Sequence, residues 1–216
     1  MLRSIAFFSL FLAPALFVAG LSAAYAVDSA DGRASALLPV ERLIRVPMTR
    51  QATDYTCGVA ALQSVLGYYG LEIREDNLSK DLKADPNEGT SYKQIADFAR
   101  SQGFTVEIKT GLTLDDLKRQ LDRKRPVICL IQAWPEKKVD FEKDWDDGHY
   151  VVAVGYDRSN VYFMDPSTLG NYTYIPAREF LKRWHDTDTH EKVVHFGMTI
   201  SKPRPSYSPT AIRPLK

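Results

Sequence analysis

Residues 50–70 have the sequence RQATDYTCGVAALQSVLGYYG, in which a polar, turn-prone loop becomes apolar directly after Cys57. Beyond that cysteine, large apolar residues recur at spacings of three and four, the period of a helix with one buried face. Gly67 and Gly70 mark its predicted end. The sequence therefore predicts a buried helix that begins at Cys57, and the rest of the chain is interpreted around it.

A cysteine at the start of a helix is well placed to act as a nucleophile. Unpaired N–H groups and about half a positive charge at the helix N-terminus favour the thiolate, which is the reactive form. Two structural alternatives stay open, a small buried helix residue and a disulfide with Cys129, the second of only two cysteines. Cys129 lies in the apolar run 127–131, which predicts a buried central strand, so we expect both thiols to be free.

The first 26 residues have the pattern of a secretory signal peptide. Arg3 precedes an uncharged apolar segment from Ile5 to about Gly20, and Ala24-Tyr25-Ala26 forms a small-x-small cleavage site. The apolar segment is short for a membrane span of about 20 residues, and an uncleaved anchor is the alternative. We expect an exported protein, periplasmic or secreted, that meets a membrane only through this segment if it is not cleaved.

The charge balance argues against polyanionic partners. The 216 residues carry 28 Lys and Arg against 27 Asp and Glu, and residues 1–26 contain only Arg3 among charged groups. The mature chain is thus nearly neutral, and we expect neither a nucleic-acid nor an ATP partner. We expect a flexible leader over 27–42, one domain over 43–201, and a disordered tail over 202–216, where prolines are frequent.

The first half of this domain is predicted to be mainly helical. After a short edge strand over 43–47 and the Cys57 helix, a short helix is expected over 74–82. Ser91 is expected to cap a further helix that Gly103 stops.

The second half is predicted to be mainly strands. Thr113 is expected to cap one more helix before the apolar strand 127–131, and residues 134–148 form a long polar loop. Expected strands are 104–109, 149–156, 161–164, 172–175 and a last strand over 193–200. A short helix over 176–184 should bury Phe180, Leu181 and Trp184 on one side.

Three motifs carry a resemblance to a known family. They are Gln51-x5-Cys57-Gly58, Asp147-Gly148-His149-Tyr150-Val151-Val152 and Tyr162-Phe163-Met164-Asp165-Pro166. In order and spacing they resemble the papain-like C39 family of cysteine peptidases, known for removing double-glycine leaders from bacteriocin precursors, over roughly residues 46–200. The resemblance implies Cys57 as nucleophile, His149 as its proton partner, Asp165 as the group that orients the imidazole, and Gln51 as an oxyanion-hole donor.

The resemblance also implies a fold. A papain-like cysteine peptidase has an α+β fold, here with an N-terminal helical half whose central helix carries Cys57. A C-terminal antiparallel sheet would carry His149 and Asp165. Counting from the turn at 157–160 leaves these two residues about three positions out of register, so their contact requires a bulge or bend. That contact is therefore implied by the resemblance, because the count alone does not produce it.

Amide hydrolysis needs these residue types on chemical grounds. It requires a strong nucleophile, a group that takes and returns a proton near neutral pH, and donors aimed at the oxygen that becomes negative. A carboxylate on the far ring nitrogen fixes the histidine tautomer and stabilises the imidazolium. Taken singly, Gln51 could be an ordinary loop residue, His149 a strand-edge histidine and Asp165 the start of a turn.

The other histidines suggest a metal site only weakly. The spacings of His185, His190 and His195, together with Glu191, match no common zinc pattern, and these histidines look structural or exposed. We expect no metal and no cofactor.

Two features depart from the family pattern. Thr56 stands before the nucleophile, where the family often has an acidic residue, and the bacteriocin-processing members are fused to a membrane transporter. Leader cleavage therefore does not carry over directly. The favoured function is an exported cysteine peptidase acting on a peptide or protein, such as a secreted precursor. The alternatives are a papain-like acyl transferase that performs transamidation, and a non-catalytic peptide-binding module that retains the fold.

Overall fold

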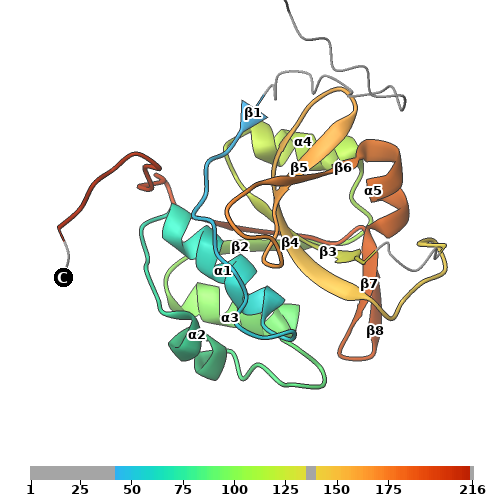
Figure 1. Ribbon diagram of the computed structural model, residues 1–216, viewed down its shortest axis with the longest axis horizontal. Coiled ribbons are helices and arrows are strands. Elements are labelled where there is room, and N and C mark those ends of the chain that lie inside the picture. The colour runs from blue at the N-terminus through green and yellow to red at the C-terminus, as the bar shows by residue number, and fades with distance from the viewer. Residues whose placement is uncertain (1–41, 135–139, 215–216) are drawn as a thin grey trace, which may run out of the picture. The chain divides into compact units, whose positions relative to one another are not determined.

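Two strands that are buried along nearly their whole length form the centre of the main sheet. They are β3 (Val127–Gln132) and β4 (Gly148–Tyr156), which pair antiparallel from Val127 opposite Ala153 to Gln132 opposite Gly148. A strand that buries every residue must be covered on both faces. In Figure 1, α1, α2 and α3 lie on one side of this sheet and α4 and α5 on the other.

The computed structural model describes residues 42–134 and 140–214, all within one compact unit. The predicted signal segment, 1–26, and all of the predicted leader except Arg42 lie outside the described residues. Within the described ranges no helix is long and apolar enough to cross a membrane. The helices there are α1 (Cys57–Tyr68), α2 (Glu75–Asp81), α3 (Tyr92–Ser101), α4 (Leu114–Asp122) and α5 (Ala177–Arg183).

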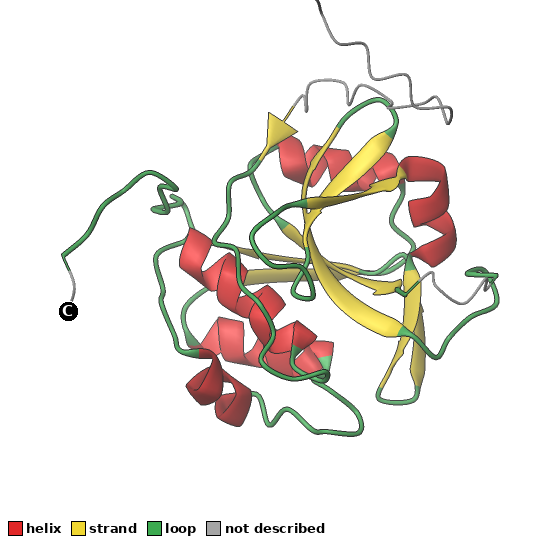
Figure 2. Cartoon of the chain, in the orientation of Figure 1, coloured by secondary structure: helices red, strands yellow, loops and turns green. Residues whose placement is uncertain are grey.

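The main sheet is antiparallel throughout, and its strands follow the order β2-β9-β3-β4-β5-β6. Strand β1 pairs with the last two residues of β4, which extend past the end of its pairing with β3. The remaining strands are β1 (Arg42–Leu43), β2 (Thr105–Lys109), β5 (Asn160–Met164), β6 (Thr173–Pro176) and β9 (Gly197–Ser201). A separate hairpin pairs β7 (His185–Asp188) with β8 (Glu191–Val194). The helices come mainly first and the strands mainly later, which confirms the α+β prediction (Figure 2).

Local sequence signals account for most helix boundaries. The Ser91 hydroxyl and the Gln94 side chain form a capping box at the start of α3, and Thr113 with Asp116 does the same for α4. Helix α1 begins at Cys57, as predicted, and is followed by Gly70 in the left-handed region at φ 87°.

Three predictions about single elements were wrong. The first strand contains only Arg42 and Leu43 rather than residues 43–47. Leu181 is exposed, while Phe180 and Trp184 are fully buried. The expected last strand over 193–200 is two strands in different sheets, because His195, which lies between β8 and β9 in the chain, has a positive φ of 50° that interrupts the extended backbone.

Candidate active site

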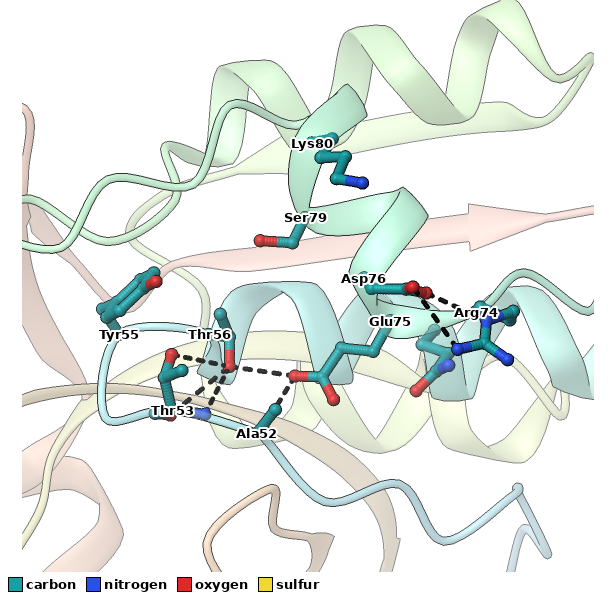
Figure 3. Close-up of a pocket in the computed structure, with 10 residues that line it drawn as sticks. Ala52, Thr53, Tyr55, Thr56, Arg74, Glu75, Asp76, Ser79 and Lys80 are labelled. Carbon is teal, nitrogen blue, oxygen red and sulfur yellow. Dashed lines mark hydrogen bonds and ion pairs between the residues drawn. The ribbon is translucent and has the colours of Figure 1, made fainter.

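The loop before α1 is held in place by a carboxylate from α2. Glu75 Oε1 accepts hydrogen bonds from the Ala52 backbone N–H at 2.8 Å and from the Thr56 hydroxyl at 2.9 Å (Figure 3). On its other side the loop is fixed by the Gln51 N–H, which donates to the Pro166 carbonyl at 3.0 Å. Because Thr56 is turned to Glu75, no side chain caps α1, and its first turn contains no acidic residue. The half-buried Cys57 thus stands at a helix N-terminus that is open to a negative charge.

His149 and Asp165 are in direct contact. His149 Nε2 lies 2.8 Å from Asp165 Oδ1, and the histidine side chain is only 3% exposed. The bulge required for this contact is present, since the β4–β5 register shifts between Ala153 and Gly155. After the shift Val152 pairs with Met164, which places Asp165 just beyond β5 and close to the start of β4.

The Asp165 carboxylate is fixed by several donors. Its Oδ1 accepts from the Ser167 N–H and hydroxyl, both at 2.8 Å, and its Oδ2 accepts from the Thr168 hydroxyl at 3.1 Å. Burial alone would raise the pKa of Asp165, but the hydrogen bond and charge of His149, aided by Ser167, lower it to about 2. Asp165 is therefore an anion throughout the physiological range.

The same contacts favour the imidazolium form of His149. Burial opposes its charge, but hydrogen bonds to Asp165 and Cys57 and the charges of both raise the pKa of His149 to about 9. Because Nε2 faces Asp165, Nδ1 is the ring nitrogen left for Cys57. Cys57, His149 and Asp165, which lie far apart in the sequence, are thus brought together in the predicted order.

Gln51 lies on the same loop, but its amide is turned toward a neighbour. Its Nε2 donates to the Thr53 carbonyl at 2.8 Å, while Oε1 is buried without a hydrogen-bond partner among the described residues. The amide group is therefore engaged within the loop, and Gln51 is not among the residues that line the cavity of Cys57 and His149.

Two buried carboxylates beside the site were missed by the sequence analysis. Asp186 and Asp188 occupy alternate positions of β7 and are each 7% exposed. A Cβ atom added at Gly148 would lie 2.3 Å from both Asp186 carboxylate oxygens, so the glycine before His149 leaves room for that carboxylate. All four residues of the sequence HDTD are polar, which is typical of an exposed segment, so the sequence carried no signal that these carboxylates are buried.

Aromatic rings border the site on the loop side. The Trp134 ring packs against the His149 ring with centroids 5.2 Å apart, and Trp145 packs against His185 at 4.4 Å. His185 is buried and its Nε2 lies 2.8 Å from the Asp144 carbonyl oxygen, which confirms a structural role. Over the described ranges, no three His, Cys, Asp or Glu side chains are placed to hold a metal ion.

Both cysteines are free, as predicted. Cys129 is fully buried in β3, and burial raises the pKa of its thiol well above the ordinary range. It packs as a small apolar residue, and Cys57 remains the accessible thiol.

Comparison with known proteins leads to a consistent family assignment. The family model described as the Peptidase_C39 like family matches residues 43–191. The transport/processing ATP-binding protein ComA of Streptococcus pneumoniae is 28% identical over 161 residues, which cover 74% of this chain but 19% of ComA. The chain therefore spans about a fifth of the length of this curated relative.

Two solved structures show the same fold. A C39-like protein from Bacillus anthracis superposes with a TM-score of 0.59 at 17% identity, covering 77% of this chain and all of that one. A double glycine motif protease from an AMS/PCAT transporter, solved in complex with the leader peptide, superposes with a TM-score of 0.50 at 18% identity and covers 77% of this chain and 96% of that one.

Proposed function

Because the chain belongs to the Peptidase_C39 like family, we propose that it is a cysteine peptidase that hydrolyses a peptide bond with Cys57, His149 and Asp165. The observation that carries the proposal is the 2.8 Å contact between His149 Nε2 and Asp165 Oδ1 in the cavity that Cys57 and His149 line. The pKa values agree with it, because that of Asp165 is lowered to about 2 and that of His149 is raised to about 9. A fixed anion beside a readily protonated imidazole supports a thiolate on the other side of the ring.

The proposed reaction begins with attack of the Cys57 thiolate on the carbonyl carbon of the substrate. The C–S bond forms as the carbonyl electron pair moves to oxygen, whose negative charge is met by the uncapped N-terminus of α1 and by the Gln51 amide. The His149 imidazolium then gives its proton to the leaving nitrogen, so the C–N bond breaks and an acyl-enzyme and a free amine result.

Water completes the cycle. Neutral His149 takes a proton from a water molecule as its oxygen attacks the thioester carbon, and the C–S bond breaks to release the carboxylic acid and restore the thiolate. Throughout both steps Asp165 holds Nε2 and so keeps Nδ1 directed at the reacting atoms. A peptide substrate is supported by the related double glycine motif protease, which was solved with a leader peptide.

The test combines thiol labelling with peptide cleavage. We expect iodoacetamide to label Cys57 in the native protein, and Cys57→Ala to abolish both labelling and hydrolysis of a peptide library followed by mass spectrometry. His149→Ala should reduce hydrolysis by several orders of magnitude, and Asp165→Asn by less, because water can partly replace an orienting group. The exposed His190, replaced by Asn, is the matched control. Hydrolysis retained by Cys57→Ala would contradict the mechanism.

The same assay separates hydrolysis from acyl transfer. Products are weighed with and without an added primary amine, because transamidation would add the mass of the amine to the new C-terminus whereas hydrolysis adds water. A protein that labels at Cys57 but forms no product from any peptide would instead be a binding module.

We also propose that the protein acts outside the cytoplasm. The support is the signal-like pattern of residues 1–26, and N-terminal sequencing of the protein from fractionated cells tests it. A mature N-terminus at Val27 in an extracytoplasmic fraction is expected, and an intact Met1 in the cytoplasmic fraction would contradict it.

A further inference from the structure

The cavity that contains Cys57 and His149 is walled by acidic side chains. Its volume is about 330 Å³, at the lower end of the range of ligand-binding pockets. Carboxylates reach it from four separate segments, the loop before α1, the turn before α3, the loop before β4 and strand β7. They are Asp54, Glu88, Asp146, Asp186 and Asp188.

The two carboxylates of β7 are buried, and neither forms an ion pair with a lysine or arginine of the described residues. Asp188 accepts hydrogen bonds from the Ser91 hydroxyl at 2.9 Å, the Tyr92 N–H at 3.3 Å and the Tyr150 hydroxyl at 3.4 Å. Asp186 accepts from Gln132 Nε2 at 3.1 Å. All of these donors are neutral. Burial raises the pKa of Asp186 to about 7 and also raises the pKa of Asp188, as expected for charges whose desolvation is incompletely offset.

No lysine or arginine of the described ranges lines this cavity. Two lysines belong to neighbouring segments, but each has another partner. Lys93 Nζ lies 3.0 Å from Glu191 Oε2, and Lys192 Nζ lies 4.2 Å from the centroid of the Trp145 ring. His149 is the one cationic group among the described residues that line the cavity, and it is paired with Asp165. The other charged groups of the wall are carboxylates, an arrangement that attracts positive charge and speeds its encounter.

A second feature of the cavity wall is independent of charge. Thr90 is 3% exposed and lines the same cavity, and its Oγ1 is buried with no hydrogen-bond partner among the described residues. Buried hydroxyls in native proteins are nearly always hydrogen-bonded, so an unpartnered one in a cavity wall indicates a position that a ligand fills. An acidic wall together with a free acceptor oxygen calls for a ligand that is positively charged and carries several N–H donors.

We propose that this cavity binds a lysine or arginine side chain of the peptide substrate, next to the bond that Cys57 attacks. The inference rests on the proposed peptidase function and names its substrate class. The ammonium or guanidinium N–H groups would donate to the carboxylates of β7 and to Thr90 Oγ1, while Asp54, Glu88 and Asp146 at the rim would attract the basic segment.

The first experiment reads the charge of the cavity through the Cys57 thiol and requires no hydrolysis. The full-length protein is treated with a cationic thiosulfonate, 2-(trimethylammonium)ethyl methanethiosulfonate, and with its anionic counterpart, 2-sulfonatoethyl methanethiosulfonate. The rate constant for the reaction of each reagent with the protein is divided by the rate constant for its reaction with the free thiol 2-mercaptoethanol, because the two reagents differ in intrinsic reactivity. We expect the cationic reagent to be favoured on the order of tenfold, a preference that declines with added salt. Cys57→Ala shows the contribution of other sites.

Variants assign the preference to the cavity. The double variant Asp54→Asn/Glu88→Gln changes two exposed rim residues, and Asp186→Asn changes a buried one. Each should lower the preference several-fold, whereas Asp115→Asn, an exposed carboxylate at the start of α4, should not. Because His149 is unchanged, its charge affects every variant alike. A preference in the rim variant equal to that of Asp115→Asn would overturn the proposal, even if Asp186→Asn failed to fold.

The second experiment uses peptides that differ only at one position near the cleaved bond, with Lys, Arg, Met or Glu there. We expect kcat/KM to be higher for Lys and Arg than for Met on the order of tenfold, and this advantage to shrink in the rim variant. Equal kcat/KM for all four peptides would overturn the cationic assignment. Absence of any cleavage, with intact labelling of Cys57, would count against the peptidase function while the reagent ratio still reports the charge of the cavity.

Discussion

Replacing Gly148 by alanine should destabilise the protein through one identifiable clash. A Cβ atom at this position would lie 2.3 Å from Oδ1 and Oδ2 of Asp186 and 2.5 Å from its Cγ, far inside van der Waals contact. Asp186 has little freedom to move away, because it is 7% exposed and hydrogen-bonded to Gln132. Gly148 itself is exposed, so the cost arises from displacing the buried Asp186, and overpacking of this kind costs roughly 1–3 kcal/mol of unfolding free energy.

The predicted loss is large enough to measure by thermal unfolding. For a chain of this size, 1 kcal/mol shifts the melting temperature by about 2–4 °C, so Gly148→Ala should lower it by about 2–12 °C. Asp186→Ala removes the atoms that clash. In the double variant we therefore expect most of the penalty from Gly148→Ala to disappear, with a coupling energy of at least about 1 kcal/mol.

The double-mutant cycle also provides the control. Asp186→Ala alone measures the loss of its contact with Gln132, and that cost cancels when Gly148→Ala is compared in the two backgrounds. If Gly148→Ala lowered the melting temperature equally with and without Asp186, or not at all, then the Asp186 carboxylate would not be the reason that a glycine precedes His149.

Three further outcomes are expected. Gln51→Ala should lower kcat by roughly 10²–10³, about 2.7–4 kcal/mol, with little change in melting temperature, whereas a sharp fall in melting temperature without a separate catalytic defect would make Gln51 structural. Because burial raises the folded-state pKa of Asp186 to about 7, the folded protein binds more protons than the unfolded chain between about pH 4 and pH 7. The contribution of protonated Asp186 to the free energy of unfolding is present in full below about pH 4 and is lost as the pH rises. Denaturant titrations should therefore show the wild type losing up to about 1.4 kcal/mol of unfolding free energy per pH unit relative to Asp186→Asn. Parallel plots of unfolding free energy against pH for the two proteins would contradict the assignment. Thiol titration of denatured, non-reduced protein should find both Cys57 and Cys129, while active protein without titratable thiols would show that they pair.

Local signals in the sequence determined much of the helical half. The capping boxes at Ser91 and Thr113 and the change from polar to apolar residues at Cys57 each depend on neighbours within one helical turn. The continuous apolar run around Cys129 likewise placed a strand at the centre of the sheet. These features could be predicted because the interactions that produce them are short in sequence.

The break at His195 was not predictable in the same way. Residues 193–200 have the composition of one strand, yet the His195 N–H donates to the Trp184 carbonyl at 2.7 Å and its ring stacks on Trp184 at 5.0 Å. Those contacts come from a segment more than ten residues away, and they hold His195 at a positive φ that ends the strand. Tertiary packing thus overrode the local preference.

For the candidate site, too, some features could be predicted from the sequence and others depended on the tertiary structure. The sequence by itself was enough to predict Cys57, His149 and Asp165 as the candidate nucleophile, imidazole and orienting carboxylate, because each lies in a short motif that resembles the family pattern. Only the tertiary structure decided that a bulge in β4 between Ala153 and Gly155 brings His149 Nε2 to 2.8 Å from Asp165, and that Asp186 and Asp188 line the cavity beside Cys57. A strand alternation in the sequence says which residues share a face, but what that face meets depends on elements distant in the chain.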